Sequence, residues 1–317
     1  MDKSGHQNRH FDTQAFLYRS IIQISVILGL GILIKLVFVD VIRMSGNQMH
    51  PTVLSGDRLL VFRSPYLPVF NKMIKPGYKK PVLFRMPSDR EKLGCLRIAA
   101  LSTDTVSIDS GMFINLGNPA LTFPFIGKDD QIHPENYSPR DYFKLYRVPA
   151  AGDMIQLDSL CSRDLFFAVS VIRQENPKDP IGIKPLLYID DSLAEDYQIS
   201  GFTLYSGSID SIPSELSTDW FFWVRLENYL KQVILPRTVS LSFAVKFDGT
   251  RIHQYIVKSD FVFLLADNWN SGLDSRYFGP VKSTNIIGRV FSVLWSHERE
   301  NGKKGHFRLN RLGKIIS

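Results

Sequence analysis

Cysteine is scarce in this sequence: only Cys95 and Cys161 occur in 317 residues. Neither belongs to a Cys-x-x-Cys pair or stands beside a histidine, so the usual spacing of a zinc site is absent. We therefore expect no bound metal. The alternatives for the two cysteines are one disulfide, which requires an oxidising compartment, and two free thiols buried in the core.

The chain also lacks a Lys/Arg-rich tract of low complexity and any motif of a nucleic-acid-binding module. Its formal net charge of +7 fits an acidic membrane surface as a partner at least as well as nucleic acid. We therefore expect membrane lipid, and no nucleic acid, among the partners. No cofactor-binding signature is present, so we expect no cofactor.

One long hydrophobic run, IIQISVILGLGILIKLVFV, occupies residues 21–39. Nineteen helical residues span about 28 Å, close to the thickness of the bilayer core. The run lacks the polar face of a soluble helix, and no small-residue cleavage pattern follows it. We predict an uncleaved transmembrane helix. Because three basic residues precede it, the positive-inside rule keeps residues 1–20 in the cytoplasm and places the chain from about residue 41 outside it.

Helical periodicity is rare beyond that run, whereas alternation of apolar and polar residues is frequent. This pattern predicts a mainly β body of antiparallel sheets or barrels. One short helix is expected at residues 219–233, DWFFWVRLENYLKQV. The predicted strands, separated by Gly, Asn and Asp, are DRLLVFR (57–63), DTVSIDSGMFIN (104–115), SLSFAVKFDG (240–249), HQYIVK (253–258), DFVFLLADN (260–268) and GRVFSVLWS (288–296).

The middle of the chain, residues 119–238, is less regular than the rest and predicts an insertion or second lobe. Residues 41–118 and 239–317 are then expected to form one β core around it. A further apolar stretch, YLPVFNKM at residues 66–73, fits either contact with the bilayer surface or ordinary core packing.

Two windows, GNQMHPTVLSGD (46–57) and ADNWNSGLDSRYFGPV (266–281), carry a resemblance to one family. Together they resemble the bacterial type I signal peptidases, whose segments read Gly-x-Ser-Met-x-Pro-Thr-Leu, then Gly-Asp, and Gly-Asp-Asn-x-x-x-Ser-x-Asp-Ser-Arg-Tyr-x-Gly. Those proteins are membrane-anchored, β-rich serine proteases that remove signal peptides from exported proteins. The resemblance implies a single-pass protein of the bacterial cytoplasmic membrane, with its main domain on the extracytoplasmic side.

The family's catalytic pair is a serine and a lysine, and this chain differs at both positions. In the family, a buried neutral lysine removes the proton of the serine hydroxyl. By register Gln48 takes the serine position, and GCLRIAALSTDTV (94–106) matches the lysine strand so that Leu96 takes the lysine position. A glutamine amide is no useful nucleophile and leucine accepts no proton. We therefore predict a catalytically inactive homologue.

The resemblance assigns supporting roles to residues around these two positions. Asp267, Asp274 and Arg276 are expected to form a buried cluster of charges and hydrogen bonds, which is tolerable only if every member is paired. Gly272 aligns with the family serine that steadies the lysine. The whole supporting set is Met49, Pro51, Asp267, Asn268, Gly272, Asp274, Ser275 and Arg276.

Three functions remain open at this level. The first is an inactive homologue that binds signal peptides or preproteins by β-augmentation, or partners an active signal peptidase. The second is an active signal peptidase with a displaced pair, in which Ser45 or Ser55 attacks and Lys79, Lys80 or Lys92 acts as base. The third is a membrane-anchored β-rich scaffold without affinity for signal peptides.

Overall fold

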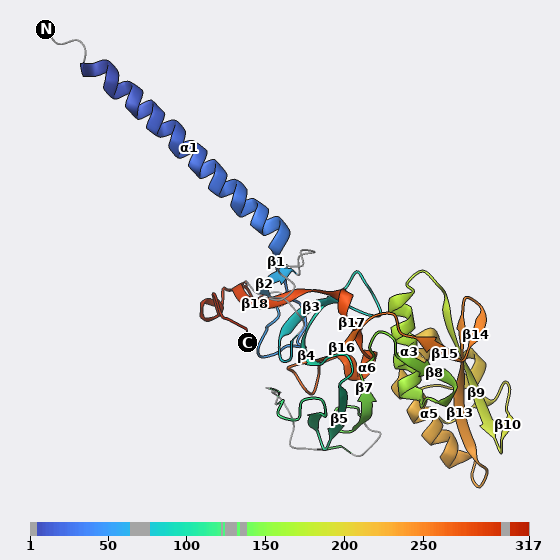
Figure 1. Cartoon of the computed structure of the whole chain (residues 1–317). Coiled ribbons are helices and arrows are strands. Elements are labelled where there is room, and N and C mark those ends of the chain that lie inside the picture. The colour runs from blue at the N-terminus through green and yellow to red at the C-terminus, as the bar shows by residue number, and fades with distance from the viewer. Residues whose placement is uncertain are drawn as a thin grey trace.

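A long N-terminal helix, α1 (Gly5–Phe38), leads into a body of sheets and shorter helices and projects away from it (Figure 1). The computed structural model describes residues 5–63, 77–121, 123, 132–133, 138–298 and 305–316. The contacts of α1 with the body involve the first two strands. Its large apolar side chains between residues 16 and 32 are 56–72% exposed, so the body leaves them uncovered.

The helix predicted at residues 21–39 is present, but it ends at Phe38 because Val39 begins the first strand. The membrane span predicted there is not confirmed. Within the part of the chain that the structure describes, no helix is long and apolar enough to cross a membrane. The stretch at residues 66–73 lies outside the described residues.

The main sheet has seven antiparallel strands in the order β1-β2-β18-β3-β4-β16-β17. Strand β18 pairs with β2 on one side and β3 on the other, so a late strand joins two early ones. Register shifts at several points of β18 mark bulges, which bend and twist a strand. The strands are β1 (Val39–Arg43), β2 (Asp57–Arg63), β3 (Pro81–Arg85), β4 (Leu93–Ala100), β16 (Phe261–Leu265), β17 (Val281–Lys282) and β18 (Ile286–Ser296).

Alternating side chains place one face of β2 in the core of this sheet. Leu59 and Val61 are fully buried, whereas Arg58, which precedes Leu59 and points to the other face, is exposed. Strand β4 lies deeper: every residue from Cys95 to Ala100 is buried, as expected where both faces of a strand are covered.

A smaller sheet, in the order β6-β5-β7, follows the main sheet along the chain. The stretch predicted at residues 104–115 forms its hairpin, with the turn at Ser110 and Gly111, both at positive φ. Its strands are β5 (Thr105–Asp109), β6 (Met112–Asn115) and β7 (Phe143–Arg147).

A second lobe packs helices α3 (Ser162–Glu175) and α5 (Trp220–Val233) against the sheet β10-β9-β13-β14. Helix α5 confirms the one helix that the sequence predicted in the body. Strand β13 begins where the predicted insertion ends and pairs along its length with β9 inside that insertion. The further elements are β8 (Met154–Gln156), β9 (Ile181–Ile189), β10 (Ser192–Leu193), β11 (Gln198–Ile199), β12 (Gly207–Ser208), β13 (Val239–Phe247), β14 (Thr250–Ile252), β15 (Gln254–Ile256), α4 (Ser214–Ser217) and α6 (Ser275–Phe278).

Aromatic rings hold the second lobe together. The Trp223 ring lies 5.1 Å from that of Phe243 and 6.4 Å from that of Phe166, measured between centroids. These rings join α3, α5 and β13 into one core, and the edge-to-face pair of Trp223 and Phe243 stabilises it beyond the area that the two rings bury.

The two cysteines are free, which excludes the disulfide alternative. Cys95 is buried in β4, as the other alternative required. Cys161 is exposed just before α3, so the expectation of two buried thiols was wrong for this residue.

Candidate functional site

Gln48 lies in the segment between β1 and β2, which its own backbone closes into a compact loop. The Met44 N–H donates to the Asp57 carbonyl (2.8 Å), and the Gly56 N–H donates to the Met44 carbonyl (3.0 Å). Gly56 has φ +92°, and a Cβ there would lie 2.2 Å from the carbonyl oxygen of His297. Only glycine fits this close approach, which accounts for the Gly-Asp pair that ends the first window.

Asp57 ties this loop to the C-terminal segment. Its carboxylate is fully buried and accepts the Nε–H of Arg311 (3.0 Å) and the N–H of Leu54 (2.8 Å). Arg311 also donates to the Thr52 carbonyl (2.8 Å). Burial raises the pKa of Asp57, but the hydrogen bonds from Arg311 and Leu54 outweigh it and lower the pKa below its usual 3.8. The loop therefore rests on a charged pair that the sequence-based reasoning did not identify.

The two windows of the sequence meet at Gln48. The N–H of Asn268 donates to the Gln48 carbonyl (3.0 Å), and the Asn268 amide Nδ2 donates to the Asn47 carbonyl (3.1 Å). The Gln48 side chain is half-buried, and within the described residues its amide makes no hydrogen bond. Donor and acceptor of that amide are thus available to a bound molecule.

Leu96 lies on β4 with 2% of its surface exposed. It belongs to the apolar core under the main sheet, together with Met49 and Ala266. The neighbouring thiol of Cys95 is buried too, and burial, followed by the charge of Asp267, raises its pKa to about 12. Neither Leu96 nor Cys95 therefore supplies a base to this site at neutral pH.

Gly272 and Ala266 lie so close together that neither position has room for a larger side chain while the other keeps its own. A Cβ at Gly272 would lie 2.1 Å from the Ala266 Cβ and 2.7 Å from the carbonyl oxygen of Asn268. The family segment has glycine where this chain has Ala266, and serine where it has Gly272. The methyl group at one position thus occupies the space that the side chain at the other would need.

The predicted charge cluster divides into two bidentate pairs. Asp267 accepts from Nε and Nη2 of Arg97 (2.8 and 2.7 Å), and Asp274 accepts from Nε and Nη2 of Arg276 (2.8 Å each). All four side chains are at most 2% exposed. The sequence matched Arg97 to the family strand but did not identify it as the partner of Asp267.

The Asp274 pair also fixes the backbone at the end of β16. The carboxylate of Asp274 caps α6 by accepting the Arg276 N–H (3.0 Å), and it accepts the Ala266 N–H (3.0 Å). The Ser275 hydroxyl accepts the Leu264 N–H (2.9 Å). The Arg276 guanidinium stacks on the Trp269 ring at 4.2 Å. These contacts give Asp274, Ser275 and Arg276 a structural task that does not depend on catalysis.

Of the fallback residues, Ser45, Ser55 and Lys92 are exposed, whereas Lys79 and Lys80 are half-buried. Ser45 and Ser55 are exposed, and the Ser55 carbonyl accepts from Nη1 of Arg308 (3.1 Å). Lys92 is 78% exposed and pairs with Asp89 at 3.2 Å. A serine–lysine pair needs a dry environment to produce a neutral amine, and the exposed Ser45, Ser55 and Lys92 are not in one.

The turn after β4 places Thr103 in the left-handed region, with φ +75°. This conformation favours glycine over a β-branched residue. The turn is held by Asp104, which accepts the Leu101 N–H (2.9 Å) and the Tyr78 hydroxyl (2.9 Å). Burial, with a further contribution from Asp104, raises the pKa of Tyr78 to about 12.

Comparison with known proteins finds the same family that the two windows resemble. A model of the family "signal peptidase, peptidase S26" matches residues 226–295, which include the second window. A signal peptidase I of Buchnera aphidicola subsp. Acyrthosiphon pisum (strain APS) is 25% identical over 284 residues, 86% of this chain and 73% of the relative. A signal peptidase I of Buchnera aphidicola subsp. Schizaphis graminum (strain Sg) is 24% identical over 198 residues, 58% of this chain and 57% of the relative. The chain is therefore similar, at distant identity, to the signal peptidase I family.

Proposed function

We propose that this chain binds signal peptides or preproteins of the export pathway without cleaving them. The observation that carries the proposal is the pair of side chains at the matched positions: a half-buried amide at Gln48 and a buried hydrocarbon at Leu96. Proton transfer from a hydroxyl to an amine requires both groups, and these two residues supply neither. Removing one member of such a catalytic unit reduces turnover by a factor on the order of 10⁶.

The loop around Gln48 supports retained binding. Asn268 holds the backbone of this loop in place through two hydrogen bonds. The Gln48 amide, which has no hydrogen-bond partner among the residues that the structure describes, offers a donor and an acceptor side by side. A peptide backbone presents the complementary pair of groups in every residue. An extended signal peptide beside the loop would thus gain hydrogen bonds where a catalytic member of the family would place its hydroxyl.

Membrane association is part of the proposal. The exposed apolar side chains of α1 form one candidate surface. A second follows β18 and the C-terminal segment, where Trp295 is 37%, Phe307 60%, Leu309 78% and Leu312 65% exposed. Exposed apolar surface of this extent is typical of contact with lipid or another protein. We propose that both surfaces hold the body on the extracytoplasmic side of the bacterial cytoplasmic membrane, where an active signal peptidase is a candidate partner.

Crosslinking tests the binding. The full-length protein carries a photoreactive residue in place of Gln48 and is mixed with a preprotein and, in parallel, with the same preprotein lacking its signal peptide. We expect an adduct with the first and none with the second, and no cleavage of either. A control with the photoreactive residue at the exposed Leu235 should give no adduct. Absence of the Gln48 adduct would favour a scaffold without signal-peptide affinity.

Cleavage tests the inactivity. If the preprotein is cut, and Ser45→Ala or Ser55→Ala abolishes the cut, the chain is an active peptidase with a displaced nucleophile. Restoring the family groups is the complementary test. Gln48→Ser with Leu96→Lys is combined with Gly272→Ser and Ala266→Gly, because a Cβ at 272 collides with the Ala266 methyl group. We expect cleavage to appear in this variant, and less stability and activity in the matched variant that keeps Ala266.

A further inference from the structure

A cavity of about 720 Å³ lies where the second lobe meets α6 and the turn between β3 and β4. Helix α3 and the start of α5 line it from the side of the second lobe. Ligand sites are common where two parts of a protein meet, and this volume is in the range of small-molecule sites. The cavity shares no lining residue with the Gln48 loop, so it is a separate feature of the molecule.

Hydrogen bonds between the same elements keep the cavity in shape. The Ser170 hydroxyl donates to the Phe278 carbonyl (3.2 Å), and Nε2 of Gln174 donates to the Pro280 carbonyl (2.8 Å). Arg90, in the turn between β3 and β4, donates from Nη2 to the Gln174 carbonyl (2.7 Å). Because α3 is tied both to the segment around α6 and to this turn, the walls are in place before a ligand arrives.

Aromatic side chains form a large part of the lining. They are Phe166 and Phe167 of α3, Trp220 of α5, and Tyr277 and Phe278 of α6. The first three are buried, whereas Tyr277 and Phe278 are half-buried. Aromatic rings from three helices therefore face one space, which favours an apolar occupant.

The residues of the lining carry no net formal charge, since Arg173 and Asp219 are its two charged members. Both are exposed, and both already have partners. Arg173 donates from Nη2 to the Ile181 carbonyl (3.1 Å), and Asp219 accepts the Phe221 N–H (2.9 Å). The cavity therefore offers a charged ligand no surplus of opposite charge, and it favours an uncharged one.

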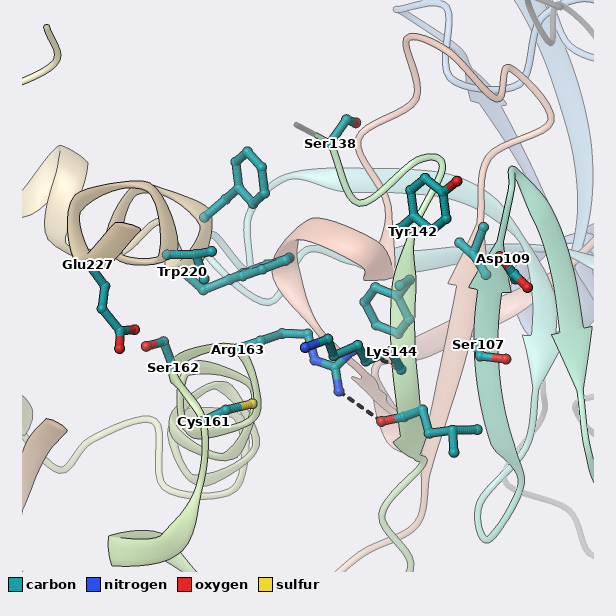
Figure 2. A pocket seen from close by; sticks show the side chains of 15 residues that line it. Ser107, Asp109, Ser138, Tyr142, Lys144, Cys161, Ser162, Arg163, Trp220 and Glu227 are labelled. Atoms are coloured by element: carbon teal, nitrogen blue, oxygen red, sulfur yellow. Dashed lines mark hydrogen bonds between the residues drawn. The ribbon is translucent and has the colours of Figure 1, made fainter. Parts of the chain in front are cut away.

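Two hydrogen-bond donors of the lining lack acceptors among the residues that the structure describes. One is the buried Nε1–H of Trp220, and the other is the hydroxyl of Tyr277. A buried donor without an acceptor is destabilising, so a ligand that brings an acceptor is favoured. Trp220 also lines a second cavity, of about 510 Å³, between β7, α3 and α5 (Figure 2). Because space lies on both sides of its ring, the indole has room to turn Nε1 toward a ligand.

Leu273 connects this cavity with the Gln48 loop. It lines the cavity, is 49% exposed, and follows Gly272, whose N–H donates to the Asn268 carbonyl (2.9 Å). The Asn268 N–H in turn donates to the Gln48 carbonyl (3.0 Å). These steps place Leu273 within about 18 Å of Gln48, a distance that about five or six residues of an extended peptide span.

We propose that this cavity holds the end of the apolar segment of a signal peptide whose small residues lie at Gln48. The inference rests on the proposed function, because it takes the signal peptide as the ligand of the Gln48 loop. A signal peptide has its apolar run before the small residues, so large apolar side chains are available at this spacing. They contact the aromatic lining, while peptide carbonyls accept from Nε1 of Trp220 and the hydroxyl of Tyr277.

Crosslinking at two positions tests the inference separately from the proposed function. The full-length protein in detergent carries a photoreactive residue in place of Leu273 or of Gln48. It is mixed with a synthetic signal peptide that has a run of leucines before its small residues. Mass spectrometry should find the end of the leucine run in the Leu273 adduct and the small residues in the Gln48 adduct.

The two adducts separate the possible failures. A Gln48 adduct without a Leu273 adduct would overturn the inference and leave the proposed function standing. Absence of both adducts would overturn both. A Leu273 adduct alone, or one with residues that follow the small residues, would overturn the placement of the apolar segment in the cavity.

Substitutions test the two donors. Tyr277→Phe removes the hydroxyl and keeps the ring, so the affinity for the leucine peptide, measured by fluorescence anisotropy, should fall about fivefold. Trp220→Phe should reduce the affinity at least as much, because it removes the N–H and part of the ring. Tyr188→Phe, on β9 and outside the cavity, should leave the affinity unchanged.

A matched peptide with serine in place of each leucine provides the control for the ligand. It should bind more weakly, and neither cavity substitution should change its affinity. Thermal unfolding verifies that each variant is folded, and Tyr277→Phe still tests the cavity if the Trp220 variant is not. Unchanged affinity for the leucine peptide in a folded Tyr277 or Trp220 variant, or an equal loss with the serine peptide, contradicts the inference.

Discussion

At the scale of single residues, the buried pairs Arg97–Asp267 and Arg276–Asp274 are needed for folding whether or not the protein is an enzyme. The residues at positions 48 and 96 are not needed in this way. Asp267 and Asp274 are each held by a bidentate guanidinium with almost no exposure to water. Losing one partner strands a charge in a dry interior, which is costly whether or not the protein is an enzyme. Replacing lysine by leucine in an apolar niche carries no such cost.

Arg276→Met should therefore be severely destabilising. It leaves Asp274 buried and uncompensated, and the free energy of unfolding should fall by about 3–5 kcal/mol. Urea unfolding measures the change. The matched control, Lys231→Met, removes the same charge from a pair that is half-exposed on its lysine side and should cost less than about 1 kcal/mol. Equal losses would show that the Asp274 pair is not specially dependent on burial.

Thr103→Gly should stabilise the protein. A β-branched residue at φ +75° is strained, and relief of such strain is worth about 1–3 kcal/mol, less about 0.4–1 kcal/mol for the greater freedom of glycine in the unfolded chain. Thermal unfolding should therefore show a higher midpoint. Thr105→Gly, two residues later in the extended strand β5, should lower the midpoint instead. A fall for both would mean that the turn prefers threonine.

The sequence predicted some of these residue-level features and not others. The windows at 46–57 and 266–281 contain Gln48 and Asn268, which contact each other in the structure. Both windows could be found from the sequence because each is a motif of several residue types at fixed spacing. The pairing of Arg97 with Asp267 was missed, since it depends on strands far apart in the chain. The fit of Gly272 to Ala266 depends on a distance of 2.1 Å, which no spacing along the chain encodes.

At the scale of elements, the loop that contains Gln48 depends on the C-terminal segment. Asp57 at the start of β2 and Arg311 near the end of the chain form a buried pair that also reaches the Thr52 carbonyl. The loop is therefore held from outside its own sequence, and its stability should respond to the charge of Asp57.

Arg311→Gln should make the free energy of unfolding less dependent on pH in the acidic range. The folded-state pKa of Asp57 is lowered, so its contribution is fully present above the ordinary value of 3.8 and is lost as pH falls through the lowered pKa. At pH 7 the variant should lose about 3 kcal/mol, and the difference from the parent protein should narrow below about pH 4. Thermal midpoints between pH 3 and pH 7 measure this. A constant difference would assign the effect to lost packing of Arg311.

Asp219 begins α5 and should control the stability of that helix. Its carboxylate accepts the Phe221 N–H at 2.9 Å, and Asp219→Ala should cost about 1 kcal/mol in chemical unfolding, the usual loss for an N-cap. Asp219→Asn keeps the cap oxygen and should remain within a few tenths of the parent. A similar cost for both variants would mean that charge, not capping, is what the helix requires.

The elements also show where sequence patterns are sufficient. Strand β2 alternates and helix α5 has one apolar face, so both were predicted. Helix α3 was missed although its apolar residues recur at a helical period as clearly as those of α5. The irregular segments on both sides of it, rich in Pro, Gly and Asp, led to the interpretation of the whole stretch as an insertion without defined elements.

At the scale of the whole molecule, α1 is structurally separate from the body. Deleting residues 1–38 should leave the far-ultraviolet circular dichroism of the sheets intact and reduce sedimentation with anionic lipid vesicles several-fold, because the most exposed apolar surface is removed. Replacing Phe307 and Leu309 by serine in the full-length chain is the companion variant, with a smaller expected loss. Unchanged sedimentation of the shortened protein would assign the membrane contact to the body alone.

The position of β18 determines when this protein can finish folding. Strands β2 and β3 are synthesised early, yet they are not neighbours in the sheet. The strand that pairs with both, β18, consists of residues 286–296 and is synthesised late. During most of translation the nascent chain therefore exposes one unpaired edge of β2 and one of β3, and unpaired strand edges promote aggregation. A frameshift or stop codon upstream of Ile286 would split the main sheet into two halves, although nearly all of the second lobe would already have been made.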